Sequence, residues 1–415
     1  MYFIQLRAFE LELDEKRKPL EHIVTLSFGI LEAYGQQLLS HYNDLASAFA
    51  MRIILKIFFA AVNVPKFFFE APANSIFQLE LPQYFKVDQN LEKWMNFLKA
   101  ICDLPVPSDA ESQPASDDEA RRRDKIIYWS NKKWCGEIMS RFVQKYGNVR
   151  WVVKTEIDSA RNIQSKYLVP FLETFVKALL RRKTHFVANK YTYFAAQFVF
   201  YAIKTEEMFN KLNPLLEELL LDVFLPMVFL TPKDLQTWKS DALEYIRKQE
   251  DQSNTNLDLK RQGVDSIALI CKKYAPDGKL YLFKFMEFVG IVLANGVNPR
   301  TNLKTDLVWK QAILHCIGVL EEQISAIESI SMQMETLLEQ YVIPEFKNEI
   351  GFLRATACRL LGAYGQIEFK KSENVQVATE CLLNCLSDSE LPVRVYVSSS
   401  SLLALLEQLF LNSIV

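Results

Sequence analysis

Apolar residues recur along most of the chain at the i, i+3, i+4, i+7 spacing of a helix that buries one face. The pattern is clear over residues 22–39, 48–62, 135–147, 167–180, 213–229, 280–294 and 332–346. No segment shows the sustained alternation of apolar and polar residues that predicts a half-buried strand. Only 12 glycines occur among 415 residues, which argues against a strand-rich fold with its many tight turns. The sequence therefore predicts an all-α protein.

Two polar stretches interrupt the helical pattern. Residues 104–127 are rich in proline, serine and charge and offer little to bury, so we expect a disordered linker loop carrying acidic and basic groups. Residues 231–262 predict a long inter-helix loop, pinned by Trp238, Tyr245 and Ile246. These breaks leave amphipathic helix pairs over residues 1–103, 128–230 and 263–415. The last array is expected to continue beyond the chain end.

A repeat is visible in the C-terminal third of the chain. Arg394 aligns with Arg354 at an offset of 40 residues, and Lys310 takes the same place 44 residues before Arg354. In each unit a cationic residue opens a helix, small residues fill its first two turns, and another amphipathic helix precedes it. Two helices per roughly 40 to 47 residues is the HEAT/armadillo period. We therefore expect about nine or ten helix hairpins stacked into a right-handed HEAT-repeat solenoid.

One pair of charged residues fits this repeat. Asp388 and Arg394 lie six residues apart across a predicted inter-helix turn. They resemble the Asp and Arg of HEAT repeats, which form a ladder of charged hydrogen bonds between adjacent turns. Asn348 stands where the preceding unit should carry the aspartate, so the ladder could break there.

Charge and cysteine content narrow the class of protein. The formal net charge is −2, so the overall balance favours neither nucleic acid nor an anionic membrane. The seven cysteines are odd in number and scattered, without a C-x-x-C motif, so we expect reduced thiols in an intracellular protein. No apolar run approaches the roughly 18 residues of a membrane span, and the N-terminus lacks the features of a signal peptide. We therefore expect no membrane insertion.

Several segments carry a resemblance to one family, in the same order along the chain. Residues 128–148, 219–248, 342–361 and 385–408 resemble segments of importin-beta-superfamily nuclear transport receptors, and the first 100 residues do so more loosely. The resemblance is strongest to the importin seven and importin eight branch. By this resemblance we expect the chain to start after the N-terminal helical domain of that family and to stop within the array. We therefore expect an internal fragment or a truncated product.

The resemblance implies a nuclear transport receptor that carries protein cargo through the nuclear pore under the control of Ran-GTP. It implies a monomer that shuttles between cytoplasm and nucleus. Its partners would be Ran-GTP, basic cargo such as ribosomal proteins or histones, and Phe-Gly nucleoporins, without direct contact to nucleic acid. The alternative is a HEAT-repeat scaffold that organises a complex without Ran dependence.

Enzymatic chemistry has little support in the sequence. The four histidines are scattered, and no H-E-x-x-H, G-x-S-x-G or Walker-type motif occurs. His315 lies beside Cys316, but a histidine satisfied within its helix is the simpler explanation than a metal or catalytic pair. We expect no enzyme activity, no catalytic or metal site, and no cofactor.

The remaining candidate residues concern binding. In a curved solenoid one helix of each pair lines the binding surface. The polar residues expected late in those second helices are Glu321, Glu322, Arg359 and Glu407. Acidic residues there would suit basic cargo.

Two further groups of residues could contact partners or enzymes. Trp129, Lys132 and Lys133 open a helix and form a candidate partner contact, although packing of the tryptophan on the preceding repeat is the simpler alternative. Ser116 is followed by acidic residues, so it is a candidate phosphorylation site for an acidophilic kinase. A solvated linker explains the same charges.

Overall fold

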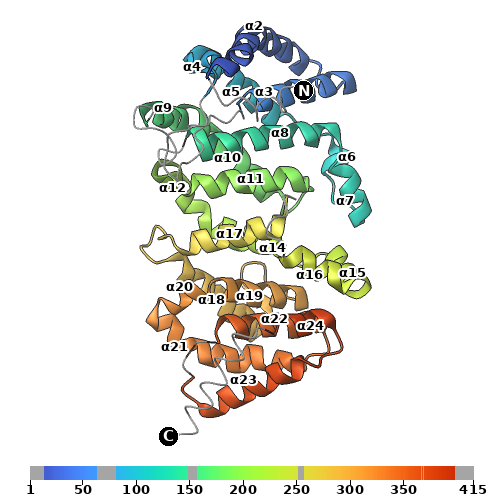
Figure 1. Ribbon diagram of the computed structural model, residues 1–415, viewed down its shortest axis with the longest axis vertical. Coiled ribbons are helices and arrows are strands. Elements are labelled where there is room, and N and C mark those ends of the chain that lie inside the picture. The colour runs from blue at the N-terminus through green and yellow to red at the C-terminus, as the bar shows by residue number, and fades with distance from the viewer. Residues whose placement is uncertain are drawn as a thin grey trace. The chain divides into compact units, whose positions relative to one another are not determined.

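The computed structural model describes residues 14–62, 81–147, 157–250, 257–365, 367 and 369–397. These residues belong to two compact units, which divide between Leu212 and Asn213. Each unit consists of helices that follow one another along the chain and pack side by side (Figure 1). The prediction of an all-α protein is confirmed.

The first unit contains helix pairs whose second members are α3, α8 and α11. Its described helical segments are α2 (Asp14–Leu39), α3 (Leu45–Val62), α4 (Gln83–Lys86), α5 (Asp88–Asp103), α6 (Ser108–Glu111), α7 (Asp117–Arg123), α8 (Ile127–Arg141), η1 (Phe142–Tyr146), α9 (Ile157–Asn162), η3 (Ile163–Leu168), α10 (Val169–Arg181), α11 (Asn189–Ala202) and α12 (Glu206–Leu212). Helix α8 packs between α3 and α11. Aromatic rings fill the core, and those of Phe58 and Trp94 stack at 4.6 Å between centroids.

Helix α3 corrects one expectation. Within the described residues it is an 18-residue helix that is long and apolar enough to cross a membrane. No such run was expected from the sequence, because Arg52 and Lys56 interrupt its apolar residues. The same length and composition are typical of the core helix of a soluble protein, and half of α3 is buried. It packs against α2 and α8, where Asn131 donates a hydrogen bond to the carbonyl of Ala48 at 3.0 Å.

Residues 104–127 differ from the disordered loop expected there. They contain the short helices α6 and α7, and Ala110 is buried. Glu111 pairs with Arg181 at 2.5 Å, and the carboxylate of Asp124 accepts the backbone N–H of Asn189 at 2.7 Å. The charges that predict a solvated linker are therefore partly used to attach this segment to α10 and α11.

The second unit continues the helix pairs. Its described segments are η4 (Asn213–Leu215), α13 (Leu216–Glu218), η5 (Leu219–Phe224), α14 (Leu225–Met227), α15 (Pro232–Ser240), α16 (Ala242–Glu250), α17 (Leu259–Cys271), α18 (Tyr281–Asn295), β1 (Val297–Asn298), β2 (Leu303–Lys304), α19 (Leu307–Val319), α20 (Glu321–Ser325), α21 (Glu328–Leu337), η6 (Leu338–Val342), η7 (Ile343–Lys347), α22 (Gly351–Ala363), α23 (Ser372–Cys385) and α24 (Leu391–Val395). The two strands form a small antiparallel hairpin that pairs Val297 with Lys304.

The second helices of these pairs are α17, α19, α22 and α24, and each packs on the next. Small residues allow the close approach. A Cβ atom added to Gly318 would lie 3.3 Å from Leu360, and one added to Gly263 would lie 2.9 Å from the carbonyl oxygen of Phe224. Gly318, near the end of α19, thus allows close packing on α22, and Gly263, early in α17, allows close packing on η5.

Residues 231–262 also differ from expectation, because most of them form α15 and α16 rather than a long loop. Thr231 and Asp234 make a capping box at the start of α15, with Pro232 in its first turn. The rings of Trp238 and Tyr245 are buried and meet at 4.8 Å. These two side chains hold the helices in place, as expected of them, whereas Ile246 stays partly exposed.

Candidate functional site

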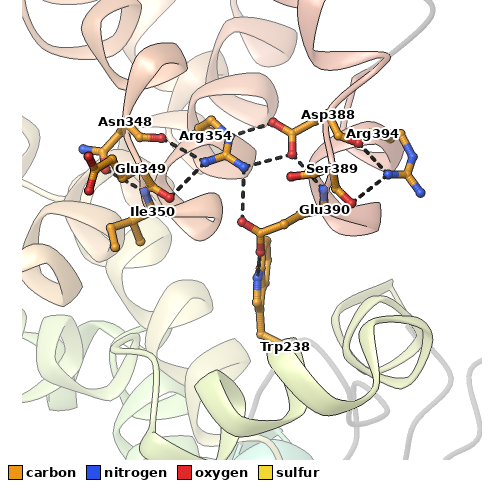
Figure 2. Close-up of polar contacts among 9 residues, drawn as sticks. All are labelled: Trp238, Asn348, Glu349, Ile350, Arg354, Asp388, Ser389, Glu390 and Arg394. Carbon is orange, nitrogen blue, oxygen red and sulfur yellow. Dashed lines mark hydrogen bonds and ion pairs between the residues drawn. The ribbon is translucent and has the colours of Figure 1, made fainter.

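The turn before α24 is built by Asp388 and Arg394, the pair singled out in the sequence. The carboxylate of Asp388 accepts the backbone N–H of Glu390 at 2.8 Å. The guanidinium of Arg394 donates to the carbonyl oxygens of Asp388 and Ser389 at 2.5 and 3.1 Å (Figure 2). The arginine thus closes the turn on its own backbone.

The turn before α22 repeats this geometry 40 residues earlier. Arg354 donates to the carbonyl oxygens of Asn348 and Glu349 at 2.9 and 3.1 Å. The side-chain oxygen of Asn348 accepts the backbone N–H of Ile350 at 2.9 Å. An asparagine can therefore replace the aspartate as the acceptor within the turn, but it brings no charge.

Arg354 also connects the two turns. Its guanidinium makes two hydrogen bonds to the carboxylate of Asp388, at 2.7 and 2.9 Å, and a third to Glu390 at 3.1 Å. Both partners of the main pair are largely buried, with side-chain exposures of 13% and 10%. The hydrogen bond from Arg354 holds the pKa of Asp388 below its ordinary value, although burial opposes the shift. Figure 2 shows this rung of the ladder between α22 and α24.

The preceding rung uses different residues. Lys310 of α19 pairs with Glu345, whose other carboxylate oxygen accepts a hydrogen bond from the side chain of Asn348 at 2.9 Å. Glu345 is only 4% exposed. The charge missing at Asn348 is thus supplied three residues earlier, and the structure shows a bridged rung where a break was considered.

Helices α15 and α16 reach the same turns. The indole N–H of Trp238 donates to the carboxylate of Glu390, which lies 152 residues further along the chain (Figure 2). Helix α16 packs on α24. The segment α15–α16, which lies between α14 and α17 in one helix pair, therefore extends to a turn three pairs further on.

A cavity of about 360 Å³ lies between α16 and the second helices of this unit. Its lining includes Gln311, His315 and Val319, which are spaced by four residues along one face of α19. Residues from α15–α16, α17, α22 and the end of α24 complete it: Trp238, Tyr245, Lys248, Gln249, Asp258, Lys260, Arg261, Val264, Asp265, Phe352, Ala355, Thr356, Arg359 and Tyr396, with Val228 and Leu230.

Charged side chains of both signs line the cavity. Lys248, Lys260, Arg261 and Arg359 line it together with Asp258 and Asp265. Lys248 pairs with Glu244 at 3.3 Å and Lys260 pairs with Asp234 at 2.5 Å. The carboxylate of Asp258 is used to cap α17, where it accepts the backbone N–H of Lys260 at 2.9 Å. Burial, with the positive charges of Arg359 and Lys260, lowers the pKa of His315 from 6.5 to about 4. The imidazole is therefore neutral at physiological pH.

The predicted cargo-binding residues lie in different places. Arg359 lines the cavity, with its guanidinium 4.6 Å from the ring centroid of Tyr396. Glu321 and Glu322 are in the first turn of α20, just after α19 has ended, rather than late in a second helix. The helix dipole favours acidic residues at that position. Glu407 lies outside the described residues.

The predicted partner contact lies mostly in the interior of the first unit. Trp129 is 3% exposed, and its indole N–H donates to the carbonyl of Ala110 at 3.3 Å. The ammonium of Lys132 donates to a backbone carbonyl, that of Cys102, and burial lowers the lysine pKa. Lys133 pairs with Glu137 one turn further along α8. Trp129 and Lys132 therefore occupy core positions, and the aromatic rings that Trp129 contacts are those of Phe186 and Tyr191, at the following helix α11 rather than in the preceding repeat.

Ser116, the candidate phosphorylation site, is exposed at the start of α7. Its hydroxyl accepts the backbone N–H of Glu119 at 3.2 Å, and the carboxylate of Glu119 accepts the backbone N–H of Ala115 at 2.8 Å. This is a helix N-cap, where negative charge is stabilised. Phosphorylation of Ser116 stays a prediction.

The sequence pattern does not single out Gln311, Lys248 or Glu345. In the structure Gln311 and Lys248 line the cavity, and Glu345 pairs with Lys310. Gln311 is a buried polar residue within the largely apolar α19, and that placement is the signal that could have identified it. Glu345 lies in the short segment η7 beside Phe346 and Lys347, where nothing in the sequence indicates its burial. Lys248 gives no such signal, because its place depends on how α16 lies against α17, α19 and α22. Among the described residues, no cluster of histidine, cysteine or carboxylate side chains is arranged to hold a metal ion.

Comparison with known proteins gives consistent matches over nearly the whole chain. An importin beta-like SAD2 homolog of Arabidopsis thaliana is 26% identical over 93% of the chain and 35% of its own length. Importin-8 of Homo sapiens is 25% identical over 94% of the chain and 35% of its own length. A probable importin-7 homolog of Dictyostelium discoideum is 24% identical over 93% of the chain and 35% of its own length. The chain thus spans about a third of the length of these relatives. No family model matches it.

One solved structure is similar in fold. It is described as the exportin Cse1 in its cargo-free, cytoplasmic state, and it is 13% identical to this chain. The match has a TM-score of 0.62 and covers 97% of this chain and 40% of that one. The prediction of a HEAT-repeat solenoid is thereby confirmed.

Proposed function

The homologues of this chain are importin-beta-like proteins, and from that premise we propose that it is part of a karyopherin-type nuclear transport receptor. The observation that carries the proposal is the match to importin-beta-like proteins over more than nine tenths of the chain. The HEAT-repeat array and its ladder of charged turns support it. Binding rather than catalysis is the activity that such an array performs.

The receptor would work by binding equilibria. Protein cargo would occupy the array in one conformation, and Ran-GTP would favour another conformation that releases or retains the cargo. Phe-Gly nucleoporins would bind weakly at several places, so that passage through the pore depends on their combined effect. The protein would accordingly shuttle between cytoplasm and nucleus.

Binding of Ran tests this function. The chain is immobilised and exposed to Ran loaded with GTP or with GDP, and binding is measured at equilibrium. A transport receptor should bind GTP-loaded Ran more tightly than GDP-loaded Ran. A HEAT-repeat scaffold without Ran dependence should show no difference between the two forms. The same comparison is made with a longer chain of the length of the relatives, because this chain spans about a third of them.

The exposed carboxylate of Glu322, with its neighbour Glu321, is the proposed contact for basic cargo. The double variant Glu321→Lys, Glu322→Lys should weaken the binding of a histone or ribosomal protein and flatten its dependence on salt. The matched control is the double variant Glu373→Lys, Glu380→Lys. It reverses two exposed charges on α23, which is the first helix of its pair. Equal losses in both double variants would count against a specific contact at α20.

A further inference from the structure

We propose that the solvent-facing side of α3, α8, η1 and α11 binds an acidic segment of a partner protein. This cationic face belongs to the first unit and is defined by six side chains: Arg52, Lys56, Lys133, Arg141, Lys145 and Lys190. The proposal goes beyond transport, because the face is formed whether or not the protein responds to Ran. It also differs from the proposed contact with basic cargo at α20, which lies in the second unit and has the opposite charge.

The sequences of these four elements are one-sided in charge. They contain seven lysines and arginines, two in α3, three in α8, one in η1 and one in α11, and a single carboxylate, Glu137. The seventh cation, Lys132, is buried. The whole chain is close to neutral, with 48 basic and 50 acidic residues. The excess of positive charge is therefore local to this face.

Packing brings the cations of different helices together. Helix α8 lies between α3 and α11 (Figure 1). The ammonium of Lys56 from α3 lies 5.6 Å from the ring centroid of Trp134 on α8, and that of Lys133 lies 3.7 Å from it. Lys133 also lies 5.4 Å from the ring centroid of Phe194 on α11. Arg52 is one turn before Lys56 on α3, so both point to the same side of that helix.

The face continues along α8 into η1. Lys133, Glu137 and Arg141 follow one another at intervals of four residues, which places them on one side of the helix. Lys145 is a further four residues along, in η1. Burial lowers the pKa of Lys145, and the positive charge of Arg141 adds to the shift. Arg141 and Lys145 are therefore near enough to repel each other.

Most of these cations have no carboxylate partner. Glu137 pairs with Lys133, and Asp124 attracts Lys190. The other four make no ion pair within the described part of the chain: Arg52, Lys56, Arg141 and Lys145. Each of these four is only partly exposed. Partly buried positive charges without counter-charges are unfavourable, so an occupant that brings carboxylates is favoured.

An acidic protein segment suits this face better than a nucleic acid does. Surfaces that bind single-stranded nucleic acid offer free aromatic rings on which bases stack. The ring of Trp134 is already covered by Lys133 and contacts Phe59 at 5.4 Å between centroids. Carboxylates need no stacking to reach ammonium and guanidinium groups. Phe49 and Ile53, which are 45% and 56% exposed beside the cations of α3, offer apolar surface to the same segment.

The experiment uses the full chain and a short fluorescein-labelled peptide that alternates glutamate and leucine. Residues 133–145 span roughly 18 Å along the helix axis, which an extended peptide of about six residues matches. Fluorescence anisotropy measures the affinity at several salt concentrations. We expect saturable binding that weakens as salt rises, and weaker binding of a peptide with the same label in which glutamine replaces every glutamate.

Two charge reversals on different elements locate the site. Lys56→Glu on α3 and Lys145→Glu on η1 should each weaken the acidic peptide by about fivefold and flatten its salt dependence, because each replaces an attraction with a repulsion. The matched control is Lys93→Glu, which reverses an exposed cation on the first helix α5 of the same unit. This control should leave the affinity unchanged.

Thermal unfolding checks that each variant is folded. If a reversal is poorly folded, the neutral variants Lys56→Gln and Lys145→Gln replace it, with an expected loss of about twofold each. The proposal is overturned if the acidic peptide does not bind, or if the reversals on the cationic face reduce its affinity no more than Lys93→Glu does. Tighter binding of oligouridylate than of the acidic peptide, measured by competition, would overturn it in favour of nucleic acid.

Discussion

Arg354 shows what single residues do in this array. It closes its own turn through two carbonyl oxygens and at the same time binds the carboxylate of Asp388 in the next turn. A lysine could not make both sets of contacts, because a single ammonium has no planar fork of donors. The guanidinium therefore joins two helix pairs through one side chain.

The contribution of this rung can be measured with Asp388→Asn. The asparagine can still accept the backbone N–H of Glu390, so the turn keeps its cap, but the buried guanidinium of Arg354 loses its main anion. We expect the free energy of opening of α22 and α24 to fall by about 3 kcal/mol, measured by hydrogen exchange. Glu373→Gln, an exposed neutralisation on α23, should leave it unchanged. A loss below 1 kcal/mol, the range of a surface pair, would contradict a structural role for the rung.

His315 makes stability depend on pH. Its pKa is about 4 in the folded protein, below the 6.5 of an ordinary histidine, so the unfolded chain binds a proton more readily. The contribution of His315 to the free energy of unfolding is fully present above about pH 7 and is lost as the pH falls from 6.5 toward 4. At pH 5 the loss amounts to about 2 kcal/mol. The variant His315→Gln should lose less free energy of unfolding than the wild type between pH 7 and pH 5. Equal losses would show that the folded pKa is not lowered.

At the scale of elements, α15 and α16 are the main departure from a regular array. They are short and polar, and their stability rests on the capping box at Thr231 and on the contacts of Trp238 and Tyr245. Trp238→Phe keeps most of the ring and removes the N–H that binds Glu390. We expect faster hydrogen exchange in α15 and α16, with a loss of about 2 kcal/mol, because the lost hydrogen bond has a charged acceptor. The control is Trp309→Phe on α19, which removes the same atoms from another tryptophan. If Trp309→Phe speeds hydrogen exchange in α15 and α16 as much as Trp238→Phe does, the hydrogen bond to Glu390 has no special role.

The same elements show how far the sequence predicts this structure. The repeat of Arg354 and Arg394 is visible because both residues serve the same local turn, and the helical pattern follows from local apolar spacing. Helices α6, α7, α15 and α16 were missed because they lack an apolar stripe and depend on caps and on contacts with distant helices. The cavity could not be predicted, since its lining comes from segments between residues 228 and 396 that the fold brings together.

At the scale of the whole molecule, helix pairs contact mainly their neighbours, so a local change should stay local. The variant Asp388→Asn lies in the second unit, and the first unit ends at Leu212. Hydrogen exchange in α8 and α11 should therefore remain at the wild-type rate while α22 and α24 exchange faster. Faster exchange by the same factor in both units would show instead that the chain unfolds as one cooperative body.

The hydrogen bond between Trp238 and Glu390 has a consequence for how the chain folds. An array of helix pairs normally forms from contacts close in sequence, which gives a low contact order and rapid folding. This bond joins residues 152 positions apart, so it can form only after the intervening pairs have assembled. During synthesis the indole emerges long before its carboxylate partner. The attachment of α15 and α16 to the turn before α24 is therefore a late step, and until it occurs the aromatic side chains of Trp238 and Tyr245 stay accessible to chaperones.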